Sequence, residues 1–373
     1  MVIRGASIII VYLGEFHTPQ IRDKCIMFSC FISSTFTILS PIAASFILRS
    51  DWYIVIPWLN ISYTPWRSFI VVAALPGLVA GFLLCFLPES PKYYLSKNQD
   101  HHAIQVLQKI FTINTGKPRK VYPIENIRRD IDEKEADLFA SGTHKAMESI
   151  WSRAKPLLSR KYVKVTLVLC ILQFVSNSTN FGMFLFFPDI VNSVETYLKS
   201  NGSSTSMCEI YEQNLRNVYN ESIDCVPKLE DSTFAYSLSL EIIYFLGFLL
   251  LSLYIKKVKK IYLLSLMLAA VGLCGFLAVL LPNPRMSLIF YTGLLLSGFG
   301  IMIMSSSVVE SYPTHLRATA MSLTTLFARA GCVFGTNYFG SLFQNYCNTS
   351  FYISGGFMWG AAALALLIPK PRF

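Results

Sequence analysis

Two ionisable side chains lie deep inside long apolar stretches of this sequence, where an isolated charge is costly. Glu241 lies about eight residues from one end of its stretch, and Arg329 about ten residues from the opposite end of another, or ~12 and ~15 Å at ~1.5 Å per residue. In a hydrocarbon layer of ~30 Å these depths nearly coincide. The sequence therefore predicts a buried pair, which either ties two helices together or places one charged group where it meets a charged substrate or a proton.

Three amides share one face of another apolar stretch. Gln173, Asn177 and Asn180 are spaced by four and three residues, which is one side of a helix. Such side chains either line a water-filled cavity or hydrogen-bond neighbouring helices, and three on one stripe favour the cavity. A further small-residue group is more typical of close helix packing, namely Gly298, Gly300, Ser305, Ser306 and Ser307.

The composition places these side chains in a membrane. The chain has 373 residues, 53% hydrophobic and 14% charged, whereas soluble domains carry about 25% charged residues. A spanning helix needs about 20 apolar residues. The pattern predicts an all-α polytopic membrane protein, a helical bundle with eight full spans at about 25–48, 68–87, 162–187, 233–254, 261–281, 286–309, 319–343 and 350–369.

A shorter apolar run, Val2 to Gly14, precedes these spans. At ~1.5 Å per residue it reaches only about 20 Å, so it is too short to cross. A signal peptide is the alternative, but Gly14-Glu15-Phe16 is a poor cleavage site. We therefore expect a partial span.

The positive charges set the orientation. If the loop after Gly14 is cytoplasmic, most Lys and Arg residues outside the spans fall on the cytoplasmic side. The net charge of +10 then reflects topology, and no nucleic-acid partner is expected. Four glycosylation sequons lie in loops assigned to the outside, at Asn60, Asn201, Asn220 and Asn348.

Three regions follow from this topology. Residues 1–87 form the remnant of an N-terminal transmembrane bundle, 88–161 a cytoplasmic central loop, and 162–373 a six-span C-terminal bundle with an outside loop at 188–232. The central loop should hold short helices near 103–111 and 124–139, with a break at Gly116. In the outside loop, Cys208 and Cys225 are expected to form a disulfide, or else to remain two free thiols.

Several function classes find no support in the residues. No metal-ligand spacing, phosphate-binding loop or catalytic triad is present, so we expect no metal, no cofactor and no enzymatic activity.

One faint internal repeat does stand out. Glu15-Phe-His-Thr-Pro-Gln-Ile-Arg22 and Glu310-Ser-Tyr-Pro-Thr-His-Leu-Arg317 each follow an apolar stretch, which suggests two related halves.

Longer motifs resemble a known family. Pro88-Glu-Ser-Pro-Lys-Tyr-Tyr-Leu95 resembles the signature of the sugar and organic-ion branch of the major facilitator superfamily. Segments 111–118, 310–320 and 327–337 are similar to the synaptic vesicle glycoprotein 2 group. The resemblance implies twelve spans, a central cavity and alternating access, with this chain in register from the family's fourth span. It also implies a cytoplasmic gate formed by charges at span ends, here Glu15, Arg22, Glu89, Glu310 and Arg317. The alternative is that these charges only satisfy the topology at the helix ends.

The chain departs from that family pattern in two places. Lysines at 256–260 stand where the family carries Gly-Arg, and a lysine cannot make a bidentate contact with a carboxylate, so a weaker gate is expected. The family's first three spans have no counterpart in this sequence. Because only two spans and a stub represent the first half, we expect the chain not to transport by itself.

Two functions of different classes fit these features. The first is a secondary transporter of a small organic solute, charged or neutral, with or without coupling to protons or other ions. The alternative is a glycosylated protein that binds ligands or partners without transport, and an incomplete gene product is a third reading. In each case we expect a multi-pass protein of the plasma membrane or an intracellular vesicle membrane.

Overall fold

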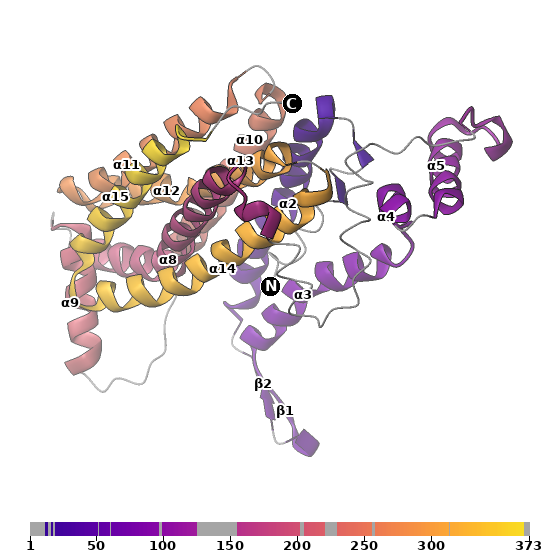
Figure 1. The fold of residues 1–373 in the computed structure, drawn as a ribbon. Coiled ribbons are helices and arrows are strands. Elements are labelled where there is room, and N and C mark those ends of the chain that lie inside the picture. Colours follow the sequence, from indigo (N-terminus) through magenta and orange to yellow (C-terminus); the bar gives the residue numbers. More distant parts are fainter. Residues whose placement is uncertain are drawn as a thin grey trace.

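Long helices make up most of the computed structural model (Figure 1). It describes residues 12–368 except 14–15, 18, 51, 60, 97–98, 125–154, 202–204, 221–229, 256–257 and 313. Helices occupy all eight predicted spans, and the fold class is confirmed. They are α2 (Pro19–Ile47), α3 (Pro65–Leu84), α8 (Val163–Asn201), α10 (Asp231–Tyr254), α11 (Lys260–Leu280), the pair α12 (Pro284–Leu295) and α13 (Ser297–Ser311), α14 (Thr314–Asn345) and α15 (Cys347–Ala365). The predicted partial span lies almost entirely outside the described residues.

Apolarity differs among these helices. Within the described part of the chain, six segments are long and apolar enough to cross a membrane, and the pair α12–α13 counts as one of them. Helices α14 and α15 are not among the six, because polar residues such as Arg329, Asn337 and Asn348 dilute their apolar runs. Both pack within the C-terminal bundle, α14 along α8 and α15 along α11 (Figure 1). Of these three polar residues, Arg329 is half-buried, whereas Asn337 and Asn348 are exposed.

Close backbone approach holds α8 against α14. A Cβ at Gly331 would lie 2.3 Å from the Phe174 carbonyl oxygen, and one at Gly335 would lie 2.1 Å from that of Ser178. Any side chain larger than hydrogen would push the helices apart. The two glycines, one helical turn apart, form a flat strip along which the backbones meet.

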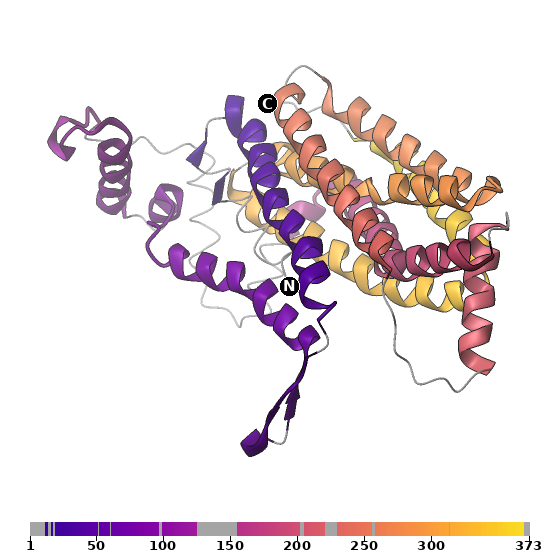
Figure 2. The same cartoon turned by 180° about the vertical axis from the view of Figure 1, so that it is seen from behind.

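The N-terminal helices are arranged differently. Helix α2 packs along α10, while none of the 20 residues of α3 is buried. Between them is a small antiparallel hairpin of β1 (Ile54–Ile56) and β2 (Ile61–Tyr63), with η1 (Pro57–Leu59) in its loop. In both views the hairpin and α9 (Met207–Asn220) lie toward the lower end and α5 (Asp100–Thr115) toward the upper end (Figures 1 and 2). Segments predicted to lie outside and inside thus occupy opposite ends.

The central connection contains α4 (Pro91–Ser96), α5, η2 (Arg119–Val121) and η3 (Lys155–Leu158). The helix predicted at 103–111 lies within α5. It ends where predicted, because Gly116 adopts a left-handed conformation with φ 69° and its amide caps the Thr112 carbonyl. The segment expected at 124–139 falls almost wholly outside the described residues.

Helix α8 extends well beyond the predicted end of its span. The predicted span stopped at 187, yet the helix continues to Asn201 with Pro188 inside it. The extension supports α9. Tyr211 of α9 donates a hydrogen bond to the Asp189 carboxylate at 2.9 Å, and burial together with that carboxylate raises the pKa of Tyr211 above its ordinary value.

The disulfide expected between Cys208 and Cys225 is a wrong prediction for this structure. Cys208 of α9 is bonded instead to Cys347 at the start of α15, 139 residues away. Both are buried, with 2% and 0% of their surface exposed. Sequence proximity favoured Cys225, but packing of α9 over the outer end of the bundle brings Cys208 to α15. Cys225 itself lies outside the described residues.

Candidate functional site

The span predicted at 286–309 is interrupted near its middle. Helix α12 ends at Leu295 and α13 begins at Ser297, with Leu296 between them at φ −64° and ψ 0°. Tighter bonds close the turn, from the Leu296 amide to the Gly293 carbonyl at 3.2 Å and from the Phe299 amide to the Leu296 carbonyl at 3.1 Å. The interruption makes the Leu295 carbonyl available to side chains from other helices.

Side chains from two neighbouring helices converge on this α12–α13 interruption. The Asn180 amide of α8 donates to the Leu295 carbonyl at 2.8 Å and to the Ser297 hydroxyl at 2.9 Å. The Tyr244 hydroxyl of α10 donates to the same carbonyl. Gly298 provides room, since a Cβ there would lie 2.6 Å from the Tyr244 hydroxyl oxygen. Three elements thus meet at one polar point inside the bundle.

The other two amides of α8 continue this polar stripe. Gln173 donates to the Ser305 hydroxyl of α13 at 3.2 Å, and Asn177 donates to the Gln173 side-chain oxygen at 3.0 Å. The Asn177 oxygen in turn accepts a weak bond from the Cys332 thiol of α14 at 3.9 Å. All three amides are buried, with 3–8% of their surface exposed. In this conformation they hydrogen-bond neighbouring helices, and cavity lining stays a prediction.

Glu241 does not pair with Arg329. The Glu241 carboxylate accepts a hydrogen bond at 2.6 Å from the Thr37 hydroxyl of α2, and among the described residues no ion pair joins it to Arg329. The predicted pair rested on equal depth in the membrane, which does not fix the direction in which each helix turns its side chains. Glu241 instead faces α2, at the contact between the N-terminal helices and the C-terminal bundle.

Glu310, one of the predicted gate residues, lies in an ion pair at the end of the bundle predicted to be cytoplasmic. Lys260 lies 2.7 Å from Glu310, and it also bonds the Ser306 hydroxyl at 3.3 Å. The lysine-rich segment thus supplies the partner that the family pattern would take from arginine. Arg317 donates to the Tyr312 carbonyl at 3.4 Å, and Glu89 is exposed. Glu15 and the side chain of Arg22 lie outside the described residues.

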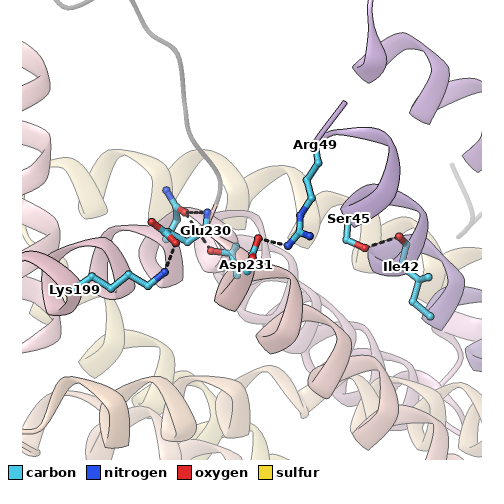
Figure 3. A network of polar contacts seen from close by, with 8 residues as sticks. Ile42, Ser45, Arg49, Lys199, Glu230 and Asp231 are labelled. Carbon is cyan, nitrogen blue, oxygen red and sulfur yellow. Dashed lines mark hydrogen bonds and ion pairs between the residues drawn. The ribbon is translucent and has the colours of Figure 1, made fainter. Parts of the chain in front are cut away.

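A network that the sequence did not predict joins α2, α8 and α10 at the end predicted to lie outside (Figure 3). Arg49, just after α2, pairs with Asp231 at the start of α10, and Lys199 of α8 pairs with the adjacent Glu230. The Asn192 side-chain oxygen accepts from the Glu230 amide at 2.9 Å and from the Thr233 hydroxyl at 3.2 Å. We call this group the outer ion-pair cluster.

The predicted glycosylation sites are only partly described. Asn348 is exposed in the first turn of α15, beside the disulfide. Asn201 and Asn220 end α8 and α9, and their side chains lie outside the described residues, as does Asn60. The sites stay predictions.

Sequence reasoning missed Tyr244, Thr37, the interruption at Leu296 and the outer ion-pair cluster. The interruption did leave a signal, because Gly293, Ser297, Gly298 and Gly300 cluster within one apolar span. Thr37 and Tyr244 left none, since a threonine or a tyrosine in a span is common and its partner depends on the packing angle.

Comparisons with known proteins give the family. The model of the Major Facilitator Superfamily matches residues 6–336. Synaptic vesicle glycoprotein 2B of Homo sapiens is 27% identical over 146 residues, which are 35% of this chain and 21% of the relative. Synaptic vesicle glycoprotein 2A of Rattus norvegicus is 25% identical over 144 residues, 35% of this chain and 19% of the relative. The match thus spans about a fifth of these relatives.

Solved structures agree on the fold. The proton:xylose symporter XylE bound to 6-bromo-6-deoxy-D-glucose has a TM-score of 0.57 at 16% identity, over 96% of this chain and 67% of that chain. A partially occluded inward-open XylE from E. coli has a TM-score of 0.52 at 15% identity, over 97% and 67%. The family model covers most of this sequence, and the chain belongs to the Major Facilitator Superfamily.

Proposed function

We propose that this protein moves a small organic solute across a membrane by alternating access, with the solute held near the α12–α13 interruption. The observation that carries this proposal is the convergence of Asn180 and Tyr244 on the Leu295 carbonyl inside the bundle. Interrupted helices provide backbone groups for ligands in secondary transporters, where a continuous helix would keep those groups bonded to itself.

The chemistry of this point favours a neutral, hydroxyl-rich solute. Asn180, Ser297 and Tyr244 offer donors and acceptors without net charge. A solute hydroxyl both donates and accepts, so it can replace the bonds among these groups when the helices move apart. The structural relative named as a proton:xylose symporter makes a sugar the first probe to use.

Glu241 is our candidate for proton coupling. It is a carboxylate within a span, and its described partner is the neutral Thr37 hydroxyl. Ionisable groups at such positions mark proton or substrate pathways. Because Thr37 belongs to α2 and Glu241 to α10, a change of protonation would act on the contact that must rearrange during transport.

Uptake by the purified chain in liposomes tests the proposal against the expectation, drawn above from the sequence, that the chain does not transport by itself. Labelled D-xylose and D-glucose should accumulate under an imposed pH gradient. Asn180→Ala should lower uptake about tenfold, because it removes two buried hydrogen bonds at the site. Asn337→Ala is the matched control, since Asn337 is exposed and bonds the carbonyl of Val333 in its own helix. Glu241→Gln should abolish the dependence on the pH gradient.

Equal effects of the two asparagine variants would contradict the proposed site. Saturable binding of a solute without any uptake would contradict transport and favour the alternative of a glycosylated membrane protein that binds ligands without moving them.

A further inference from the structure

A lipid-facing cavity lies directly beneath the outer ion-pair cluster. Its volume is about 310 Å³, and it lies between the last two turns of α2 and the first two turns of α10. The lining is apolar except at two places, where Ser45 and Arg49 contribute polar atoms; the other lining residues are Pro41, Ile42, Phe46, Phe234, Ala235 and Leu238. This volume is at the lower end of the range of small-molecule sites.

The cavity has its charge at one end and its apolar walls at the other. Arg49 follows the outer end of α2, and Pro41 lies eight positions earlier, which is ~12 Å deeper into the membrane at ~1.5 Å per residue. Phe46, with 75% of its surface exposed, and Ala235, also exposed, leave the cavity open toward the surrounding lipid. An occupant can therefore enter sideways from the bilayer.

From this arrangement we propose that the cavity binds an anionic phospholipid, with its phosphate on Arg49 and the upper part of an acyl chain between α2 and α10. Guanidinium groups bind phosphate through two parallel hydrogen bonds. The apolar walls match a hydrocarbon chain, and the depth of Arg49 matches the headgroup region at the end of the span.

The present partner of Arg49 can be displaced. The side chains of Arg49 and Asp231 are 52% and 77% exposed, so their ion pair contributes little stability. Asp231 remains in water when it loses Arg49. A bound phosphate would therefore compete with Asp231, and it would loosen the tie that holds α2 to α10 at the outer end.

The test is lipid binding by the purified chain in detergent, followed by native mass spectrometry. The probes are phosphatidylglycerol and phosphatidylcholine of the same chain length, with inorganic phosphate as a third arm. Phosphatidylglycerol should bind best, and Arg49→Ala should weaken its binding about tenfold, as expected on losing hydrogen bonds to a charged group. Asp231→Asn should strengthen binding, because it removes the competitor.

The matched control is Arg67→Ala. Arg67 has the same charge and also lies at the outer end, but it donates to the Ser62 carbonyl at 2.7 Å and does not line this cavity. Arg67→Ala should leave binding unchanged, whereas Ala235→Phe should weaken it by filling the cavity. Equal losses from Arg49→Ala and Arg67→Ala, weaker binding by Asp231→Asn, or binding of inorganic phosphate as tight as that of the lipid would each overturn the proposal.

Discussion

Helices α8 and α3 are both apolar enough to cross a membrane, yet they meet very different surroundings. In the most apolar part of α8, 61% of the residues are buried by protein, against 0% in α3. In these most apolar parts, the mean hydropathy is 1.3 for α8 and 2.0 for α3. The more apolar helix is thus the less buried one, because protein partners need polar and small residues whereas lipid needs neither.

Glycine shows the same contrast at atomic scale. Gly331 and Gly335 of α14 touch the backbone of α8 so closely that no Cβ fits. At Gly77 and Gly81 of α3, an added Cβ would meet nothing within 4 Å. The same residue type is therefore a packing requirement in the C-terminal bundle and a replaceable residue in α3.

The largest expected effect comes from filling that contact. Gly335→Leu should cost more than ~3 kcal/mol of folding free energy, because the helices must separate to admit the side chain. Gly81→Leu should change stability by less than ~0.5 kcal/mol. The difference is measured by heating the two variants in detergent and recording the fraction of each protein that stays monodisperse. A Gly335→Leu protein as stable as the wild type would show that α8 and α14 do not pack in this way.

A second prediction concerns the disulfide. Cys208→Ser should destabilise the C-terminal bundle by about 4–5 kcal/mol, because the link to Cys347 closes a long loop between α9 and α15. Cys85→Ser is the control, since Cys85 is a free and exposed thiol after α3. Peptide mapping without reduction should find Cys208 joined to Cys347. A peptide that joins Cys208 to Cys225 would restore the pairing expected from the sequence.

The smallest effect is expected at the cytoplasmic end. Lys260→Gln should cost about 1 kcal/mol, because it removes a partly buried pair with Glu310. Lys109→Gln, at an exposed position of α5, should cost nothing measurable. Stability at low and at high salt separates the two, since the loss from Lys260→Gln should shrink as salt screens the pair. A loss from Lys260→Gln that does not depend on salt would argue against an ion pair.

The spans could be predicted from sequence because twenty apolar residues identify a membrane helix without any knowledge of its neighbours. The position of Glu241 well inside its helix could be predicted for the same reason. Its partner could not, since depth says nothing about rotation, and the carboxylate faces Thr37 rather than Arg329. Helical spacing was enough to predict that Gln173, Asn177 and Asn180 share one face of α8. Their hydrogen-bond partners could not be predicted, because they depend on where α13 and α14 pack.

The predicted disulfide and the predicted end of α8 were both wrong, for related reasons. Loop residues were paired by proximity, but α9 is a helix fixed across the bundle, which brings Cys208 to Cys347. The predicted span ended at 187, yet α8 continues through Pro188, because neighbouring elements allow a proline within a membrane helix. In both cases the deciding information was tertiary packing.

The most direct test of alternating access is a cross-link across the contact between the two regions. Arg49→Cys and Asp231→Cys in one chain, joined by a short linker that attaches to each cysteine through a disulfide bond, would hold α2 against α10 at the outer end. A linked pair at Ser62 and Arg67, both within the N-terminal region, is the control. The account predicts that linking positions 49 and 231 stops D-xylose uptake into liposomes and that reductant restores it, while the control pair has no effect. Uptake that continues at full rate in the completely linked 49–231 protein would contradict it.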